Sequence, residues 1–144
     1  MAASKNNHTL ETLWKHMSTL SPTTPLGTLT EITTFFAPTG SFYLHGMTQG
    51  PSTSHASLIT TLQTLQTYWK IVERKLVTHV EGEDGTIVNA MSNKLLILGK
   101  EVNGFAECEV VRFDEDARIK EYLLYCDAAA VKEAFAQKAV EEEE

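Results

Sequence analysis

The sequence predicts an α+β fold, in which helices from the first half of the chain pack against a curved antiparallel sheet formed by the second half. The sheet is predicted from residues 69–127, where four apolar-alternating runs rich in Val, Ile, Leu, Tyr and Phe follow one another. The helices are predicted from residues 9–69, where apolar side chains recur mostly at helical spacing. Turn signals between the four runs join them into a single meander.

Two helices are expected before the first strand. Apolar side chains at i, i+3, i+4 and i+7 predict a first helix over residues 9–20, and two prolines follow it. The second helix is predicted over residues 26–36, where Thr28 and Glu31 fit a capping box and Ala37-Pro38 stops the helix.

A short strand and a third helix complete the N-terminal half. The strand is predicted over residues 41–45, followed by an uncharged, glycine-flanked loop over residues 46–53. Ser54 is a suitable N-cap for the next helix, because its hydroxyl can accept an amide hydrogen bond from the first turn. That helix is expected to continue to Trp69, where the meander begins.

The meander is predicted to contain four strands separated by three turns. Asp-Gly and Asn-Gly pairs favour tight turns, because glycine and asparagine tolerate positive φ angles. The expected strands cover residues 69–81, 86–102, 105–113 and 118–127, and the expected turns lie at Asp84-Gly85, Asn103-Gly104 and Asp114 to Ala117. A final helix over residues 128–140, capped by Asp127, is expected after the last strand.

Length and composition indicate one soluble domain. A chain of 144 residues fits a single domain, which we place at residues 8–138, with flexible termini at residues 1–7 and 139–144. No run approaches the roughly 20 apolar residues of a membrane span, and the first residues lack the apolar segment of a secretion signal. We therefore expect a cytoplasmic protein with no membrane partner.

Charge and cysteine content exclude several kinds of site. The net charge is −7, of which Glu141–Glu144 contribute four negative charges, and the basic residues form no stripe of the kind that binds nucleic acid. Cys108 and Cys126 are too few for a clustered-cysteine metal site, and we expect both to be reduced thiols. No metal, no cofactor and no nucleic-acid partner is therefore expected.

The order of the expected elements resembles the nuclear transport factor two-like superfamily, in particular its SnoaL-like branch. The most specific segment is Val110–Tyr122, VVRFDEDARIKEY, which is similar to the strand, turn and strand near the end of many such proteins. Asp127 matches an aspartate that closes the last strand, whereas Ala117 stands where these proteins usually have a turn glycine. The resemblance covers Thr9 to Phe135, and small fungal proteins of this branch have a similar order of helices and strands.

The resemblance implies a cone-shaped α+β barrel, in which a strongly bent sheet wraps over three helices and leaves a pocket at its open end. Ketosteroid isomerase, polyketide cyclases, limonene epoxide hydrolase and scytalone dehydratase belong to this superfamily, which also contains non-catalytic modules. Their catalytic sets do not transfer residue by residue: the epoxide hydrolases use an Asp-Arg-Asp arrangement, whereas the strands here hold Arg74 and Arg112 without an aspartate inside any strand. The resemblance also implies a homodimer through the outer face of the sheet.

Three side chains are candidates for proton transfer: His45, Glu73 and Glu107. His45 ends the short strand at the expected rim of the pocket, and imidazole can move protons near neutral pH; a surface histidine bonded to the loop is the alternative. Glu73 lies among apolar neighbours, and an ion pair with a basic side chain is the alternative to a role as general base. Glu107 shares a strand face with Glu109, and the pair is either an inward acid and base or a solvated pair on the outer face.

Five further side chains are candidates for substrate binding: Tyr43, Trp69, Asn93, Tyr122 and Trp14. Tyr43 shares a strand face with His45, and the Tyr122 hydroxyl needs a partner if it is buried. The amide of Asn93 could hold a carbonyl oxygen or a hydroxyl group. The two tryptophans lie on the apolar faces of the first and third expected helices.

The apolar runs and the candidate residues predict a pocket protein for a small, largely apolar metabolite. The resemblance implies that it acts as a cofactor-free isomerase, cyclase or dehydratase of secondary metabolism through general acid–base catalysis. A non-catalytic binding or dimerisation module of the same fold is the alternative. The polarity of the pocket distinguishes the two, because a carboxyl group or histidine of perturbed pKa favours catalysis, whereas a wholly apolar lining favours binding.

Overall fold

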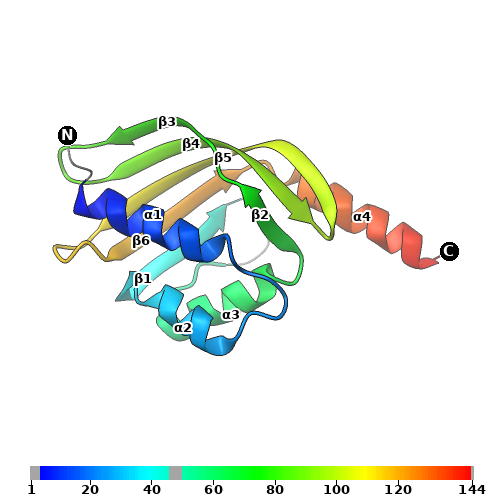
Figure 1. The fold of residues 1–144 in the computed structure, drawn as a ribbon, viewed down its shortest axis with the longest axis horizontal. Helices are drawn as coiled ribbons and strands as arrows, with labels where there is room; N and C mark the ends of the chain where they lie inside the picture. Colours follow the sequence, from blue (N-terminus) through cyan, green and yellow to red (C-terminus); the bar gives the residue numbers. More distant parts are fainter. Residues whose placement is uncertain (1–3, 46–49, 144) are drawn as a thin grey trace.

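Within the residues that the computed structural model describes, 4–45 and 50–143, a bent sheet of six strands curls over three helices (Figure 1). A fourth helix follows the last strand. In chain order the elements are α1 (Lys5–Met17), α2 (Leu26–Thr33), β1 (Phe36–His45), α3 (His55–Leu65), β2 (Trp69–Glu73), β3 (Leu76–Glu81), β4 (Ile87–Ile97), β5 (Lys100–Phe113), β6 (Ile119–Cys126) and α4 (Ala129–Glu143). The predicted α+β architecture, a curled sheet over N-terminal helices, is confirmed.

The strands lie in the order β1-β6-β5-β4-β2, and β3 pairs with β4 beside β2. Strand β2 pairs with the C-terminal half of β4, whereas β3 pairs with its N-terminal half. The pairs are antiparallel except β1 with β6, which is parallel, so the sheet is mixed rather than wholly antiparallel. Strands β4 and β5, which are 11 and 14 residues long, pair from Ile87 with Val111 to Ile97 with Lys100 and form the long middle of the curved sheet.

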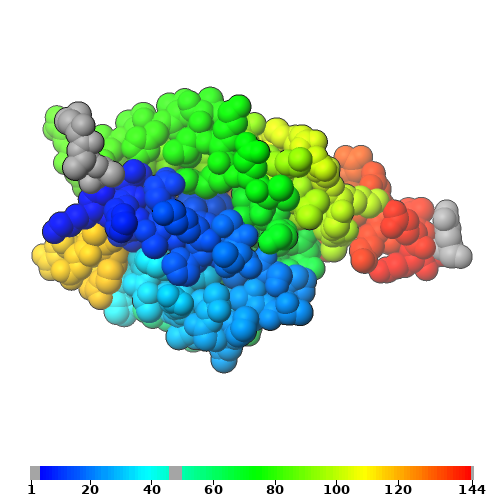
Figure 2. All heavy atoms as spheres, viewed as in Figure 1, coloured from blue at the N-terminus to red at the C-terminus, as the bar shows by residue number. Residues whose placement is uncertain are grey.

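The core lies between the inner face of the sheet and helices α1 to α3. Inward and outward side chains alternate along β4, where every second residue from Ile87 to Ile97 is buried. Helix α1 packs its apolar stripe on this face through Leu10, Leu13, Trp14 and Met17. In Figure 2, α1 lies across the body of the molecule, and α4 extends away from it.

The first two helices differ from their predicted bounds. Ser4 caps α1, because its hydroxyl accepts the amide hydrogen of Asn7 at 3.0 Å, so residues 5–7 are helical rather than flexible. Residues 1–3 lie outside the described part of the chain. Helix α2 begins at Leu26 as predicted, but Pro25 stands at its cap position in place of the expected Thr28 capping box, and the helix ends at Thr33 rather than at residue 36.

Strand β1 is longer than predicted, and α3 is shorter. The strand begins at Phe36 rather than at residue 41, because Phe36 is buried in the core as a strand residue and not as the end of a helix. The predicted cap of α3 is confirmed, since Ser54 and Ser57 form a reciprocal capping box. Trp69 is the first residue of β2 rather than the end of α3, and residues 46–49 lie outside the described residues.

Two predicted strands are divided differently in the structure. The run over residues 69–81 breaks at Arg74-Lys75 into β2 and β3. The hairpin between β4 and β5 turns at Leu98-Gly99, with φ angles of 52° and 79°, and not at Asn103-Gly104. Gly104, with a φ of 63°, instead forms a bulge, where Asn103 and Gly104 stand opposite the single residue Lys94.

The other two predicted turns are confirmed. Gly85 has a φ of 83° in the turn between β3 and β4, and Ala117 adopts a φ of 59° in the turn between β5 and β6. Asp127 accepts the amide hydrogen of Ala129 at 2.9 Å, as expected for the cap of α4. Helix α4 continues to Glu143 instead of ending near residue 140, and the described helices include none long and apolar enough to cross a bilayer.

Candidate functional site

A cavity of about 50 Å³ lies between the inner face of the sheet and the helices. Seven aromatic side chains contribute to its wall: Trp14, Phe36, Phe42, Tyr68, Trp69, Phe105 and Tyr122. Aliphatic side chains from α1, α2, α3, β1, β6 and α4 supply most of the remainder, from Leu13, Met17, Ile32, Leu44, Leu58, Leu62, Leu65, Leu124 and Val131. Among the described lining residues, Glu107 carries the only carboxyl group.

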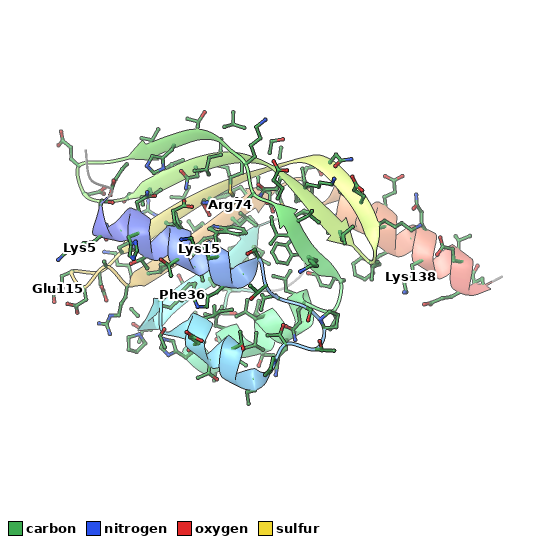
Figure 3. The ribbon with its side chains drawn as sticks, in the orientation of Figure 1. Lys5, Lys15, Phe36, Arg74, Glu115 and Lys138 are labelled. Carbon is green, nitrogen blue, oxygen red and sulfur yellow. The ribbon has the colours of Figure 1, made fainter. Side chains whose placement is uncertain are left out.

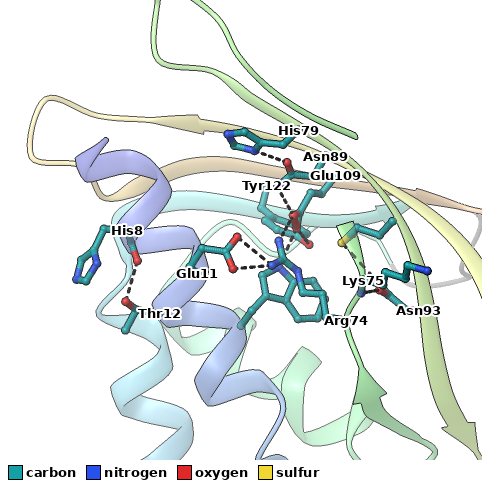
Figure 4. Close-up of polar contacts among 12 residues, drawn as sticks. His8, Glu11, Thr12, Arg74, Lys75, His79, Asn89, Asn93, Glu109 and Tyr122 are labelled. Atoms are coloured by element: carbon teal, nitrogen blue, oxygen red, sulfur yellow. Dashed lines mark hydrogen bonds and ion pairs between the residues drawn. The ribbon is translucent and has the colours of Figure 1, made fainter. Parts of the chain in front are cut away.

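Glu109 of β5 lies behind this wall, fully buried, and accepts four hydrogen bonds (Figure 4). Its Oε1 atom accepts from Trp14 Nε1 at 2.8 Å and from the Tyr122 hydroxyl at 2.9 Å. Its Oε2 atom accepts from Arg74 Nη2 at 2.8 Å and from Asn89 Nδ2 at 2.9 Å. Because these donors fill the four acceptor positions of a carboxylate, Glu109 organises the wall and has no free acceptor position to offer a guest.

Arg74 connects this carboxylate to helix α1 and lies between the helix and the sheet (Figure 3). Its Nη1 atom donates to both carboxylate oxygens of Glu11, at 2.7 and 2.9 Å. Its guanidinium carbon lies 4.9 Å from the ring centroid of Trp14, within cation–π range. Glu11, Arg74 and Glu109 thus form a carboxylate–guanidinium–carboxylate chain, built from glutamates rather than the aspartates of the epoxide hydrolases.

The break between β2 and β3 places Asn93 and Arg74 in their positions. At the break, the amide of Lys75 donates to Asn93 Oδ1 at 3.0 Å, which turns the Asn93 amide nitrogen toward Glu107. Asn93 Nδ2 then donates a short hydrogen bond to Glu107 Oε2. The same break directs the side chain of Arg74 inward to Glu109. The irregularity in the strand therefore builds the polar base of the cavity.

Glu107 has the electrostatic properties of a proton-transfer group. Its pKa is raised from the ordinary 4.5 to about 7, chiefly because burial disfavours the charged form. The hydrogen bond from Asn93 and the charge of Arg74 lower the pKa, whereas the charge of Glu109 raises it. Within the described residues Asn93 is the only donor to this carboxyl group, so Oε1 accepts no hydrogen bond from them.

The Tyr122 hydroxyl is held as a donor. Burial and the neighbouring carboxylates Glu109 and Glu107 raise the pKa of Tyr122 well above 10.0. Its proton therefore stays in the hydrogen bond to Glu109, and the hydroxyl presents only acceptor capacity toward other groups.

The structure brings together five of the eight predicted site residues. Trp14, Trp69, Glu107 and Tyr122 line the cavity, and Asn93 is fully buried directly beside Glu107. Of the two orientations left open for the Glu107 strand face, the inward one is observed, because Glu107 and Glu109 are 6% and 0% exposed. Asn93 contacts the carboxyl group of Glu107, however, and is not itself a lining residue.

His45, Tyr43 and Glu73 do not lie at the cavity, contrary to expectation. Strand β1 alternates, and its inward positions are taken by Phe42 and Leu44, so His45 and Tyr43 project from the other face. There the His45 ring stacks on Tyr125, with ring centroids 4.4 Å apart. Glu73 is exposed at the end of β2.

The sequence pairs Glu109 with Glu107 as an acid and a base, and it does not reveal the cluster around Glu109. The partners of Glu109 come from α1, β4, β6 and the break after β2, which are distant in the sequence. The sequence contains one partial sign of this cluster: Glu11 and Trp14 lie one turn apart on the same face of the predicted first helix.

Comparison with known proteins places the fold. No protein-family model and no curated protein sequence matches the chain. Among solved structures, a proposed isomerase of Bacillus subtilis superposes with a TM-score of 0.73 at 17% identity, covering 93% of this chain and 96% of that one. A proposed SnoaL-like polyketide cyclase of Shewanella putrefaciens gives a TM-score of 0.70 at 10% identity, with coverage of 94% and 99%. An NTF2-like protein of Burkholderia xenovorans also gives 0.70, at 14% identity, with coverage of 93% and 98%.

The chain has the nuclear transport factor two-like fold. The resemblance inferred from the Val110–Tyr122 segment and from the order of elements is confirmed at the level of the fold. Identities of 10 to 17% in these comparisons carry no information on substrate or reaction.

Proposed function

We propose that this NTF2-like chain acts on a small, largely apolar metabolite without a cofactor, and that Glu107 transfers the proton. The supporting observation is a single carboxyl group with a pKa of about 7 in the wall of an otherwise apolar cavity. A group with this pKa is present in both protonation states near neutral pH, so it can take up and return a proton in one cycle. Isomerisation, cyclisation and dehydration each need such a transfer.

The chemistry that fits this geometry is proton abstraction next to a carbonyl group. Glu107 Oε1 would accept the proton, while Asn93 fixes the carboxyl group through Oε2. Trp69 lines the same cavity, and an indole N–H is the kind of donor that would stabilise the carbonyl oxygen as negative charge develops there. The carbon–hydrogen bond breaks, the carboxyl group carries the proton, and the same group returns it to another carbon or to the same one.

Hydrogen–deuterium exchange of a compact ketone tests this proposal without knowledge of the natural substrate. Cyclopentanone in D2O, followed by proton NMR, should lose its α-hydrogens faster in the presence of the protein. General acid–base catalysis by one group typically contributes about 10²- to 10⁴-fold, so Glu107→Gln should reduce the protein-dependent rate by about 100-fold or more. His45→Ala is the matched control, because His45 lies on the other face of β1. Exchange that persists in Glu107→Gln would refute the assignment.

A non-catalytic binding module is the second candidate, favoured by the almost wholly apolar wall and by the small size of the cavity. The two candidates differ in the exchange experiment. A binding module would take up cyclopentanone, measured by quenching of tryptophan fluorescence, and would not accelerate exchange.

We also infer that the chain forms a homodimer through the outer face of the sheet. The helices cover only the inner face, and the outer face carries apolar side chains that remain accessible, including Val80 at 53% and Tyr125 at 43% exposure. Tyr125→Arg should therefore lower the mass measured by sedimentation equilibrium to that of a monomer. Val140→Arg on α4, where Val140 is 57% exposed, is the control and should leave the mass unchanged.

A cytoplasmic location completes the proposal. Cys108 and Cys126 are both free, as expected, and they project from opposite faces of the sheet, so they cannot pair within one chain. Free thiols are typical of a reducing compartment.

A further inference from the structure

The charges around the cavity do not balance. Glu107 lines the cavity, and Glu109 and Glu11 lie behind its wall. Arg74 is the only cationic side chain that donates to any of these three carboxyl groups in the part of the chain described. Both of its terminal nitrogens are engaged by Glu11 and Glu109, so Glu107 has no cationic partner. No cation among the described residues therefore donates to the Glu107 carboxyl group, which would carry an uncompensated negative charge when it is ionised.

The wall next to Glu107 is suited to an organic cation. Seven of the lining side chains are aromatic, and the face of an aromatic ring attracts a cation, most strongly once water is excluded. Trp14 already shows this property, since the guanidinium of Arg74 lies 4.9 Å from its ring centroid. A proton neutralises the Glu107 carboxyl group, and a bound cation would instead pair with its ionised form.

We propose that the cavity binds a small alkylammonium ion, whose charge pairs with the carboxylate of Glu107 and whose alkyl groups contact the aromatic wall formed by Trp14, Trp69, Phe105 and Tyr122. This rests on the proposed function, because the same cavity and the same carboxyl group serve both. The alkyl part must be compact, because the cavity has a volume of only about 50 Å³.

Three probes with the same tert-butyl body separate charge from shape: tert-butylammonium, tert-butanol and pivalate. The reporter is intrinsic fluorescence, because both tryptophans of the chain, Trp14 and Trp69, line the cavity. At pH 8 Glu107 is mostly ionised, and we expect tert-butylammonium to bind at least tenfold more tightly than tert-butanol, and pivalate to bind most weakly. Equal or tighter binding of tert-butanol at pH 8 would overturn the inference.

The pH dependence of binding provides a second readout. An alkylammonium ion stays protonated between pH 5.5 and 8, whereas Glu107, with a pKa of about 7, changes from almost fully protonated to mostly ionised. Because only the ionised carboxyl group pairs with the cation, the apparent affinity for tert-butylammonium should fall by about 30-fold from pH 8 to pH 5.5. The affinity for tert-butanol should stay within about twofold.

Substitution identifies the group responsible. Glu107→Gln has almost the same shape and should abolish the preference for the ammonium probe, while tert-butanol still binds and shows that the cavity is intact. Glu101→Gln, at an exposed glutamate of the same strand, is the control and should retain the preference. A preference that survives in Glu107→Gln would overturn the inference.

The two proposals can fail separately. If cyclopentanone exchange depends on Glu107 but the ammonium probe has no advantage, only the inference on ligand charge is refuted. If the ammonium probe has the expected advantage but no exchange occurs, the inference stands, and the catalytic role of Glu107 is refuted.

Discussion

Glu107 and Glu109 lie two positions apart on the same face of β5, yet their surroundings give them opposite properties. Glu109 is surrounded by four donors, including a guanidinium, whereas Glu107 has a single amide donor and an apolar cavity beside it. The same residue type therefore serves as a structural anchor in one position, and in the other it is a carboxyl group of raised pKa in the wall of the cavity.

The raised pKa of Glu107 predicts a specific pH dependence of stability. The folded state binds a proton with a pKa of about 7 and the unfolded state with the ordinary 4.5, so the folded protein binds more protons between these values. The stabilising contribution is therefore complete below pH 4.5, decreases as the pH rises, and is lost above pH 7. Between low and high pH, this contribution of Glu107 to the free energy of unfolding changes by about 3 kcal/mol. Glu107→Gln should remove this dependence.

Urea unfolding at pH 4.5, 6 and 8 measures the effect. The free energy of unfolding of Glu107→Gln, relative to that of the unchanged protein, should increase by about 3 kcal/mol from pH 4.5 to pH 8. Glu115→Gln, at an exposed turn position, should show no such trend. A difference that is constant with pH would contradict the buried, proton-binding state of Glu107.

Asn93, together with the charge of Arg74, keeps the pKa of Glu107 from rising further. Its amide hydrogen bond favours the ionised carboxyl group, so Asn93→Ala should raise the pKa of Glu107 above 7. Carbon-13 NMR of the glutamate side chains would measure the change. Ser92→Ala, at the neighbouring outward position, is the control, and a pKa that decreases in Asn93→Ala would contradict the role assigned to the amide.

At the scale of the elements, one cluster joins helix α1 to the sheet. Arg74 comes from the break between β2 and β3, Glu11 from α1 and Glu109 from β5. Removing Arg74 leaves the fully buried Glu109 without its cation, and breaking such a pair costs about 3 to 5 kcal/mol. Arg74→Ala should lose stability of this size in urea unfolding, whereas Arg112→Ala, which breaks an exposed pair with Glu121, should lose about 1 kcal/mol or less.

A double variant tests why Arg74→Ala loses stability. If the cost of Arg74→Ala comes from the unpaired carboxylate, Glu109→Gln introduced together with it should recover part of the lost stability. Additive losses in the double variant would show instead that packing of the arginine stem is responsible.

The turn between β5 and β6 contains a strained residue. Ala117 has a φ of 59°, and a residue with a Cβ atom costs about 1 to 2 kcal/mol in this left-handed region. Ala117→Gly should therefore raise the free energy of unfolding by about 1 kcal/mol, partly offset by the greater freedom of glycine in the unfolded chain. Ala136→Gly in the exposed face of α4 should do the opposite and lower stability by about 0.5 to 1 kcal/mol. A loss of stability in Ala117→Gly would contradict this account.

At the scale of the whole molecule, periodicity and turn chemistry predict the fold well. The capping box at Ser54, the turns at Gly85 and Ala117, and the order of helices and strands all follow from local sequence patterns. The curvature of the sheet was predicted from the family resemblance of Val110–Tyr122. The position of the β4–β5 hairpin was not predictable in this way, because Asn103-Gly104 suits a bulge as well as a turn.

The candidate site could be predicted only in part, for a physical reason. Alternation identifies which side chains share a strand face, but it does not say which face is inward when both faces carry apolar residues. On β1, one face carries Phe42 and Leu44 and the other carries Tyr43 and His45, so either face could be the inward one. Phe42 and Leu44 are the residues that line the cavity, and His45 therefore lies on the outer face. The contacts of Glu109 depend on pairings across 95 and 35 residues, which no local pattern encodes.

The most direct test of the account is the titration of the Glu107 carboxyl group in the folded protein, followed by carbon-13 NMR with Glu107→Gln to assign the resonance. We expect a midpoint near pH 7, because the group is buried beside Glu109 and no cationic side chain among the described residues donates to it. A midpoint near the ordinary 4.5 would show that the carboxyl group is hydrated, and it would contradict both its proposed role in proton transfer and its place in an apolar cavity.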